Sequence, residues 1–124
     1  MATDANDHPY KLFGQLRGRE LSSVEFVRDY LQLRFDGGPT INVMSPVVVT
    51  RAAGRSRSWD DQFRNALCGQ IGKSVGNAEV VEQLHLLIAF DDGSEITISL
   101  VPDDYGGPEA VYYHGFDNAE WGVI

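Results

Sequence analysis

Carboxylates occur in adjacent pairs in this sequence of 124 residues. Asp91 neighbours Asp92, Asp103 neighbours Asp104, and Glu109 follows the second pair closely. Acid–base catalysis needs two carboxyl groups that lie in different environments and face one cavity. The first pair instead lies between two apolar segments, where turn geometry favours Asp. We therefore expect these carboxylates to contact a partner and assign no catalytic residue.

One short segment is basic. Arg57 directly precedes Ser58, Arg55 lies two residues before Arg57, and Arg51 comes shortly before them. A helix is expected to begin just after this segment, and helix N–H groups together with guanidinium groups form anion sites. Arg55, Arg57 and Ser58 are therefore candidate anion ligands. The alternative is that residues 51–58 are a flexible linker.

Residue types that bind metals or act as nucleophiles are isolated along the chain. His8, His85 and His114 have no metal-ligand spacing, and Cys68 is the single cysteine. The sequence also lacks a G-x-S-x-G segment. It therefore predicts no metal, no cofactor and no catalytic site, so an enzyme is the less favoured class.

The net charge of −8 is concentrated in the second half of the chain. Residues 63–124 contain ten acidic side chains and two basic ones, whereas residues 1–62 contain eight of each. This field disfavours binding to a nucleic-acid backbone and suits a basic protein partner. No apolar run approaches the ~20 residues of a membrane span, and the acidic N-terminus does not resemble a secretory signal. We expect a cytoplasmic protein without a membrane partner. For its oligomeric state, a homodimer is one alternative.

A repeated segment positions the acidic turn. Residues 31–43 and 86–98 match at an offset of 55, and each has alternating apolar residues around a turn, the pattern of a β-hairpin. The second hairpin has Leu87 and Ala89 where the first has Gln32 and Arg34, so we expect it to hold the more central strand, covered on both faces. The identical pairs are Leu31/Leu86, Phe35/Phe90, Asp36/Asp91, Gly38/Gly93 and Ile41/Ile96.

One helix is predicted between the two hairpin units. Ser58 is its expected N-cap, and Trp59 and Phe63 fall in one apolar stripe. We predict an α+β fold, in which two related β-units (about 18–50 and 72–101) form one curved antiparallel sheet with a helix over about 59–69 on its concave face. Closure into a roll or barrel would remove exposed edges. Residues 1–9 are expected to form a flexible arm, and residues 10–124 one domain.

Four segments of the second half form a pattern of their own: Gly72–Val75, the turn Phe90–Ser94, the apolar strand Ile96–Leu100, and Gly107–Ala110. In these segments the chain resembles a group of small bacterial proteins of unknown function. The turn of the first unit departs from the pattern. The resemblance implies a small α+β domain without an established activity, and some such proteins are suspected toxin-immunity factors.

Two classes of function follow from these observations. The favoured one is a non-enzymatic, immunity-type interaction domain that binds a basic protein, because opposite fields speed association. The alternative is a small-molecule-binding protein or enzyme with a pocket between helix and sheet, lined by Trp59, Phe63 and His85 or His114. The candidate partner contacts are Asp91, Asp92, Asp103, Asp104, Tyr105 and Glu109.

Overall fold

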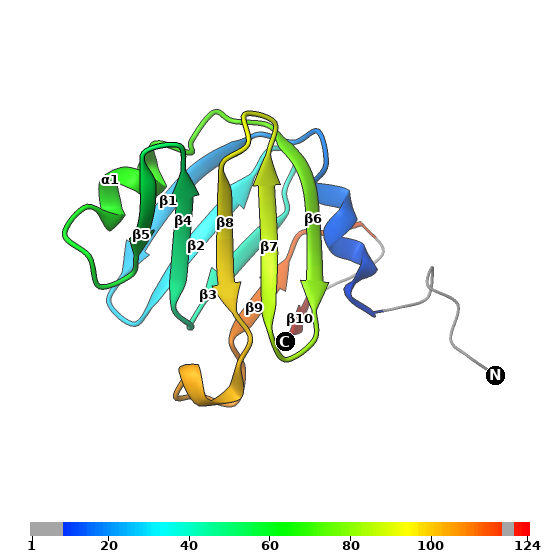
Figure 1. The fold of residues 1–124 in the computed structure, drawn as a ribbon. Helices are drawn as coiled ribbons and strands as arrows, with labels where there is room; N and C mark the ends of the chain where they lie inside the picture. Colours follow the sequence, from blue (N-terminus) through cyan, green and yellow to red (C-terminus); the bar gives the residue numbers. More distant parts are fainter. Residues whose placement is uncertain (1–8, 118–120) are drawn as a thin grey trace.

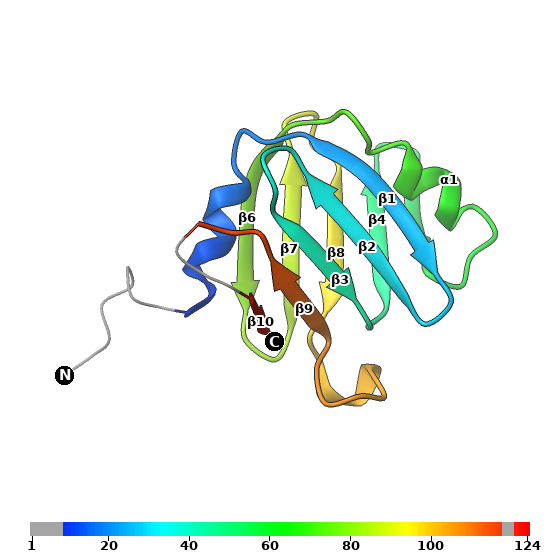
Figure 2. The same ribbon diagram turned by 180° about the vertical axis from the view of Figure 1, so that it is seen from behind.

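The computed structural model describes residues 9–117 and 121–124, which form two five-stranded antiparallel sheets packed face to face (Figures 1 and 2). The 3-10 helix η2 (Pro9–Leu16) and the helix α1 (Phe63–Cys68) lie at opposite sides of this sandwich. The arm was predicted over residues 1–9, of which residues 1–8 lie outside the described residues and Pro9 begins η2. The strands are β1 (Leu21–Val27), β2 (Tyr30–Phe35), β3 (Thr40–Val43), β4 (Val47–Arg51), β5 (Gly54–Arg57), β6 (Val75–Val81), β7 (His85–Phe90), β8 (Glu95–Ser99), β9 (Val111–His114) and β10 (Trp121–Val123).

The antiparallel α+β character is confirmed, but the prediction of a single curved sheet is wrong. The strand orders are β1-β2-β3-β9-β10 and β5-β4-β8-β7-β6, so the two repeated hairpins, β2–β3 and β7–β8, lie in different sheets. Their apolar faces meet in the core, where Leu33, Ile41, Ile88 and Ile96 are fully buried. The sheets do not close into a barrel. β2 and β7 are each second from an edge, so the expectation of a more central second hairpin is also wrong.

Each sheet combines strands from both halves of the chain. β1–β2–β3 and β6–β7–β8 are consecutive antiparallel strands. The strand that follows each set crosses to the other sheet, so β4 pairs with β8 and β9 pairs with β3. Each half therefore supplies its last hairpin, β4–β5 or β9–β10, to the sheet of the other half.

The two halves meet where the segments leading into β1 and β6 cross. The Gly18 N–H donates to the Val75 carbonyl, and the Gly72 N–H donates to the Leu21 carbonyl, both at 2.8 Å. These residues are equivalent at an offset of 54 (18 to 72 and 21 to 75), so the contact is reciprocal. A reciprocal contact is typical of a local twofold axis.

The helix is shorter than predicted, and it does not pack on the sheet face that was expected to be covered. It begins at Phe63, while Trp59 is 70% exposed, and it contacts β1, β4 and β5 rather than a concave sheet face. Ser58 does not cap it, because its hydroxyl accepts a bond from the Val47 N–H (2.7 Å) and donates to the Val47 carbonyl (3.1 Å). The Asp60 carboxylate accepts a backbone N–H bond within the intervening turn (2.8 Å). None of the helices in the described part of the chain is long and apolar enough to cross a membrane.

Gly115 lies where the turn after β9 approaches the β2–β3 turn. Its φ is 82°, and a Cβ there would lie 2.2 Å from the Gly38 carbonyl oxygen. We expect Gly115→Ala to lower the free energy of unfolding by about 2–4 kcal/mol, because it adds left-handed strain and a backbone clash. Urea denaturation measures this change. Gly106→Ala is the matched control, since a Cβ there meets nothing within 4 Å, and equal effects of the two variants would contradict the prediction.

Candidate functional site

The repeat makes two corners of the sandwich equivalent, both at its lower edge in Figure 1. Each corner combines a hairpin turn (β1–β2 or β6–β7) with the chain that crosses between the sheets (β3 to β4 or β8 to β9). Each also contains a cavity, of about 400 Å³ at the first corner and about 280 Å³ at the second. Differences between these corners reveal what the fold itself does not require.

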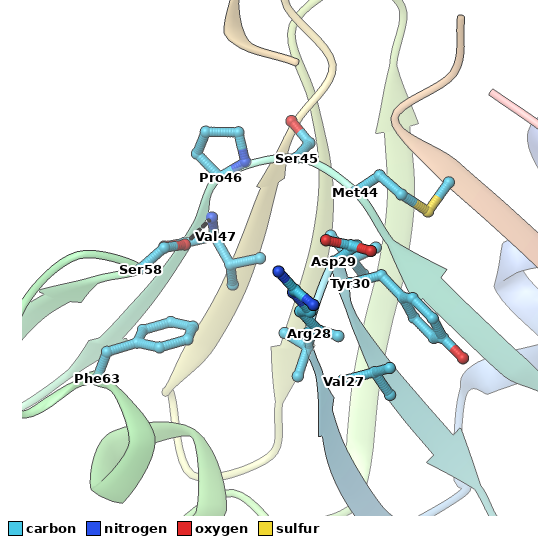
Figure 3. A pocket seen from close by; sticks show the side chains of 12 residues that line it. Val27, Arg28, Asp29, Tyr30, Met44, Ser45, Pro46, Val47, Ser58 and Phe63 are labelled. Carbon is cyan, nitrogen blue, oxygen red and sulfur yellow. Dashed lines mark hydrogen bonds between the residues drawn. The ribbon is translucent and has the colours of Figure 1, made fainter. Parts of the chain in front are cut away.

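The first corner is an open cavity with an apolar floor. Val43, Val47 and Phe63 form the floor, while Arg28 and Asp29 come from the β1–β2 turn. Figure 3 shows the Arg28 side chain over the middle of this cavity. Such a cavity suits a small molecule with an apolar body and an anionic group.

The alternative pocket predicted from the sequence is present only in part. Phe63 lines the first corner, but Trp59, His85 and His114 do not. His85 and His114 lie on β7 and β9, and within the described residues no group of three or more His, Cys, Asp and Glu side chains could hold a metal ion.

The second corner has a much longer crossover. β3 reaches β4 through three residues, Met44–Pro46, whereas β8 reaches β9 through eleven, Leu100–Ala110. Both crossovers occupy equivalent places, because the Met44 N–H donates to the Ala110 carbonyl (2.8 Å) and the Ser99 N–H donates to the Pro46 carbonyl (3.0 Å). The longer crossover is therefore an addition to a connection that three residues can make.

The added residues form an ordered acidic loop. Pro102–Asp104 is the 3-10 turn η3, and the Ser99 hydroxyl donates to the Asp104 carboxylate at 2.5 Å. Tyr105 is half-buried against the core and lines the second cavity, whereas Asp103 is exposed and Glu109 half-exposed. Glu82, in the β6–β7 turn, lines the same cavity and adds a fourth carboxylate to this corner.

Asp91 and Asp92 lie at the opposite edge of the sandwich, in the β7–β8 turn (Figure 1). The Asp92 carboxylate pairs with the Lys73 ammonium at 2.7 Å and accepts bonds from the Ser94 hydroxyl and N–H. The bond from Lys73, then those from Ser94, hold the pKa of Asp92 far below its ordinary range. The predicted acidic contacts are thus divided between two places, and one of these carboxylates stabilises its own turn.

The basic segment is a strand, so the flexible-linker alternative is wrong. Arg55 and Arg57 lie exposed on β5, at the edge of the second sheet. Ser58 bonds to the Val47 backbone, and α1 begins only at Phe63. The expected helix start beside the arginines is absent, and only their guanidinium groups stay available to an anion.

In comparisons with known proteins, no family model, curated protein or solved structure matches the chain. The resemblance to bacterial proteins of unknown function therefore stays a prediction. The two halves of the chain provide the internal comparison on which the assignment of a site depends.

Acid should weaken the fold through the β7–β8 turn. A carboxyl group whose folded-state pKa is lowered stabilises the protein above its unfolded pKa of about 3.9, and this stabilisation is lost as the pH falls below that value. Asp92→Asn removes the Lys73 ion pair, so we expect its Tm to lie below that of the wild type at pH 6. The difference should shrink progressively below about pH 4.

Scanning calorimetry from neutral to acidic pH measures this dependence. Asp91→Asn is the matched control, because it removes a neighbouring turn carboxylate that makes no ion pair with any described residue. A difference between wild type and Asp92→Asn that stays constant into strong acid would contradict the assignment.

Proposed function

We propose that this protein is a non-enzymatic interaction domain that binds a basic protein through the loop Val101–Glu109. The main support for this proposal is the length of the second crossover. The first half shows that three residues complete the connection, yet the second half uses eleven. Loops that exceed what a fold needs are common sites of function.

The chemistry of the loop supports a basic partner. Asp103, Asp104 and Glu109 give it three carboxylates in a half of the chain that has ten acidic and two basic residues. Such a field steers a cationic protein toward the second corner and raises its association rate. Tyr105 lies within the loop and is half-buried, so it supplies a rigid aromatic contact of the kind common at interface centres.

An immunity-type role is the most specific form of the proposal. The domain would neutralise a basic toxin in the bacterial cytoplasm by covering it with the acidic corner. The resemblance of residues 72–110 to bacterial proteins suspected of this role supports it, as does the net charge of −8.

Reversing one exposed charge tests the interface. We expect wild-type protein to capture a basic protein from a lysate of its source organism, and Asp103→Lys to weaken this complex about tenfold or more. Asp91→Lys is the matched control, because it makes the same charge change in the β7–β8 turn at the opposite edge. The complex should also weaken steeply as salt is raised. Capture of no basic protein, or equal loss with both variants, would contradict the proposal.

The second candidate function is binding of a small amphiphilic anion at the first corner. The position of Arg28 over an apolar floor favours it (Figure 3). Octanoate, at ten times its Kd, should raise the Tm by about 4 °C or more. Thermal shift measures the effect, which Arg28→Gln should remove and the exposed Arg34→Gln should preserve. No shift, or equal shifts in both variants, would exclude this role.

A further inference from the structure

The outer face of the first sheet contains another cavity. It measures about 340 Å³ and is lined by Tyr30 and Gln32 from β2, Asn42 from β3, Met44 just after β3, and Tyr112 from β9. In Figure 3, Tyr30 and Met44 extend to the side opposite Phe63. This cavity lies on a sheet face, apart from the acidic loop.

Two side-chain amides lie beside each other on this face. Asn42 pairs with Gln32 on one neighbouring strand and with Tyr112 on the other. Two strand spacings of about 4.8 Å each separate β2 from β9, so the strands that hold the two tyrosines are roughly 10 Å apart. Asn42 lies on the strand between the two that hold the tyrosines.

The chemistry of the cavity is neutral and rich in hydrogen-bonding groups. The five lining side chains are uncharged, although the protein has a net charge of −8. The guanidinium group of Arg34, beside them on β2, donates to the side-chain carbonyl of Gln32 at 3.5 Å. The Asn42 amide makes no hydrogen bond to any residue that the structure describes, so both its donor and acceptor atoms are open to a ligand. Asn is also uncommon in strands, where packing favours β-branched and aromatic residues.

An aromatic platform continues from the cavity toward the sheet edge. The rings of Tyr112 and Trp121 stack with centroids 5.8 Å apart and an interplanar angle of 25°. Trp121 is 60% exposed although it is large and apolar. The platform lets a ligand longer than one ring continue across β10.

The second sheet shows that the fold does not require this surface. The repeat places one residue of the second sheet at each equivalent position, and among these residues there is no tyrosine, tryptophan or side-chain amide. They are His85 for Tyr30, Leu87 for Gln32, Thr97 for Asn42, Ser99 for Met44 and Val48 for Tyr112. Packing and strand pairing therefore do not account for the aromatic and amide side chains of the first sheet.

We propose that this face binds a neutral oligosaccharide. Sugar rings would stack on Tyr112 and Trp121 and contact Tyr30 across the cavity, since the faces of aromatic rings attract the weakly positive C–H groups of a pyranose. The sugar hydroxyls would exchange hydrogen bonds with Gln32 and Asn42, which both donate and accept. A nucleotide fits less well, because none of the lining side chains is a cation, the neighbouring Arg34 bonds to Gln32, and the acidic protein repels phosphate.

Titration calorimetry with cellohexaose, xylohexaose, maltohexaose and chitohexaose tests this proposal. We expect at least one of the four to bind the full-length protein. Tyr30→Ala should weaken binding about tenfold or more, and Asn42→Ala about two- to tenfold. The matched controls are His85→Ala and Thr97→Ala, the equivalent positions of the second sheet, which should bind as tightly as the wild type. Circular dichroism checks that each variant is folded.

Three results would overturn the proposal. The first is the absence of binding by all four hexasaccharides at about 5 mM, a concentration well above the Kd of weak specific complexes. The second is adenosine binding that depends on Asn42, which would assign the cavity to a nucleobase. The third is a wild-type dimer in light scattering that Tyr30→Ala dissociates, which would assign the face to self-association.

Discussion

The reciprocal crossing of the two halves determines the rest of the structure. At one edge the segments before β1 and β6 exchange backbone hydrogen bonds, and at the other edge the two sheet-to-sheet crossovers do the same. Between these contacts, each half supplies its last hairpin to the sheet of the other half. Neither sheet is complete with one half of the chain, so the core between the sheets contains strands from both halves.

The repeat distinguishes the features that the fold requires from the features that it does not require. Features present in both halves are structural, such as Gly18 and Gly72, which both have a positive φ, or the buried pair Leu33 and Ile88. Two features have no equivalent in the repeat: the acidic crossover loop of the second half, and the aromatic, amide-bearing outer face of the first sheet, to which both halves contribute strands. The first suits a cationic protein, the second a neutral ring molecule, and they lie on different parts of the surface.

The sequence predicts local structure well and pairing between distant strands poorly. Apolar residues that alternate around a glycine-containing turn predict the hairpins β2–β3 and β7–β8 correctly, because the side-chain period and the turn chemistry act over a few residues. Nothing in that alternation shows that β4 pairs with β8 rather than β3, since both pairings bury the same apolar face. The helix start was misplaced because Ser58 bonds to Val47, eleven residues away in the chain.

Because pairing between distant strands is hard to predict, the sequence predicts the residues of the candidate sites better than their positions. The acidic residues of the loop could be recognised from composition, but their separation from Asp91 and Asp92 depends on the direction of β8. The cavity on the outer face of the first sheet needs β9 beside β3, so Tyr30 and Tyr112 line one cavity only because the second half supplies β9 to this sheet. Inter-strand nuclear Overhauser effects in the full-length protein test that exchange most directly. The exchange predicts contacts of Val49 with Ile96 and of Ile41 with Tyr113, whereas contacts between β3 and β4 would contradict it.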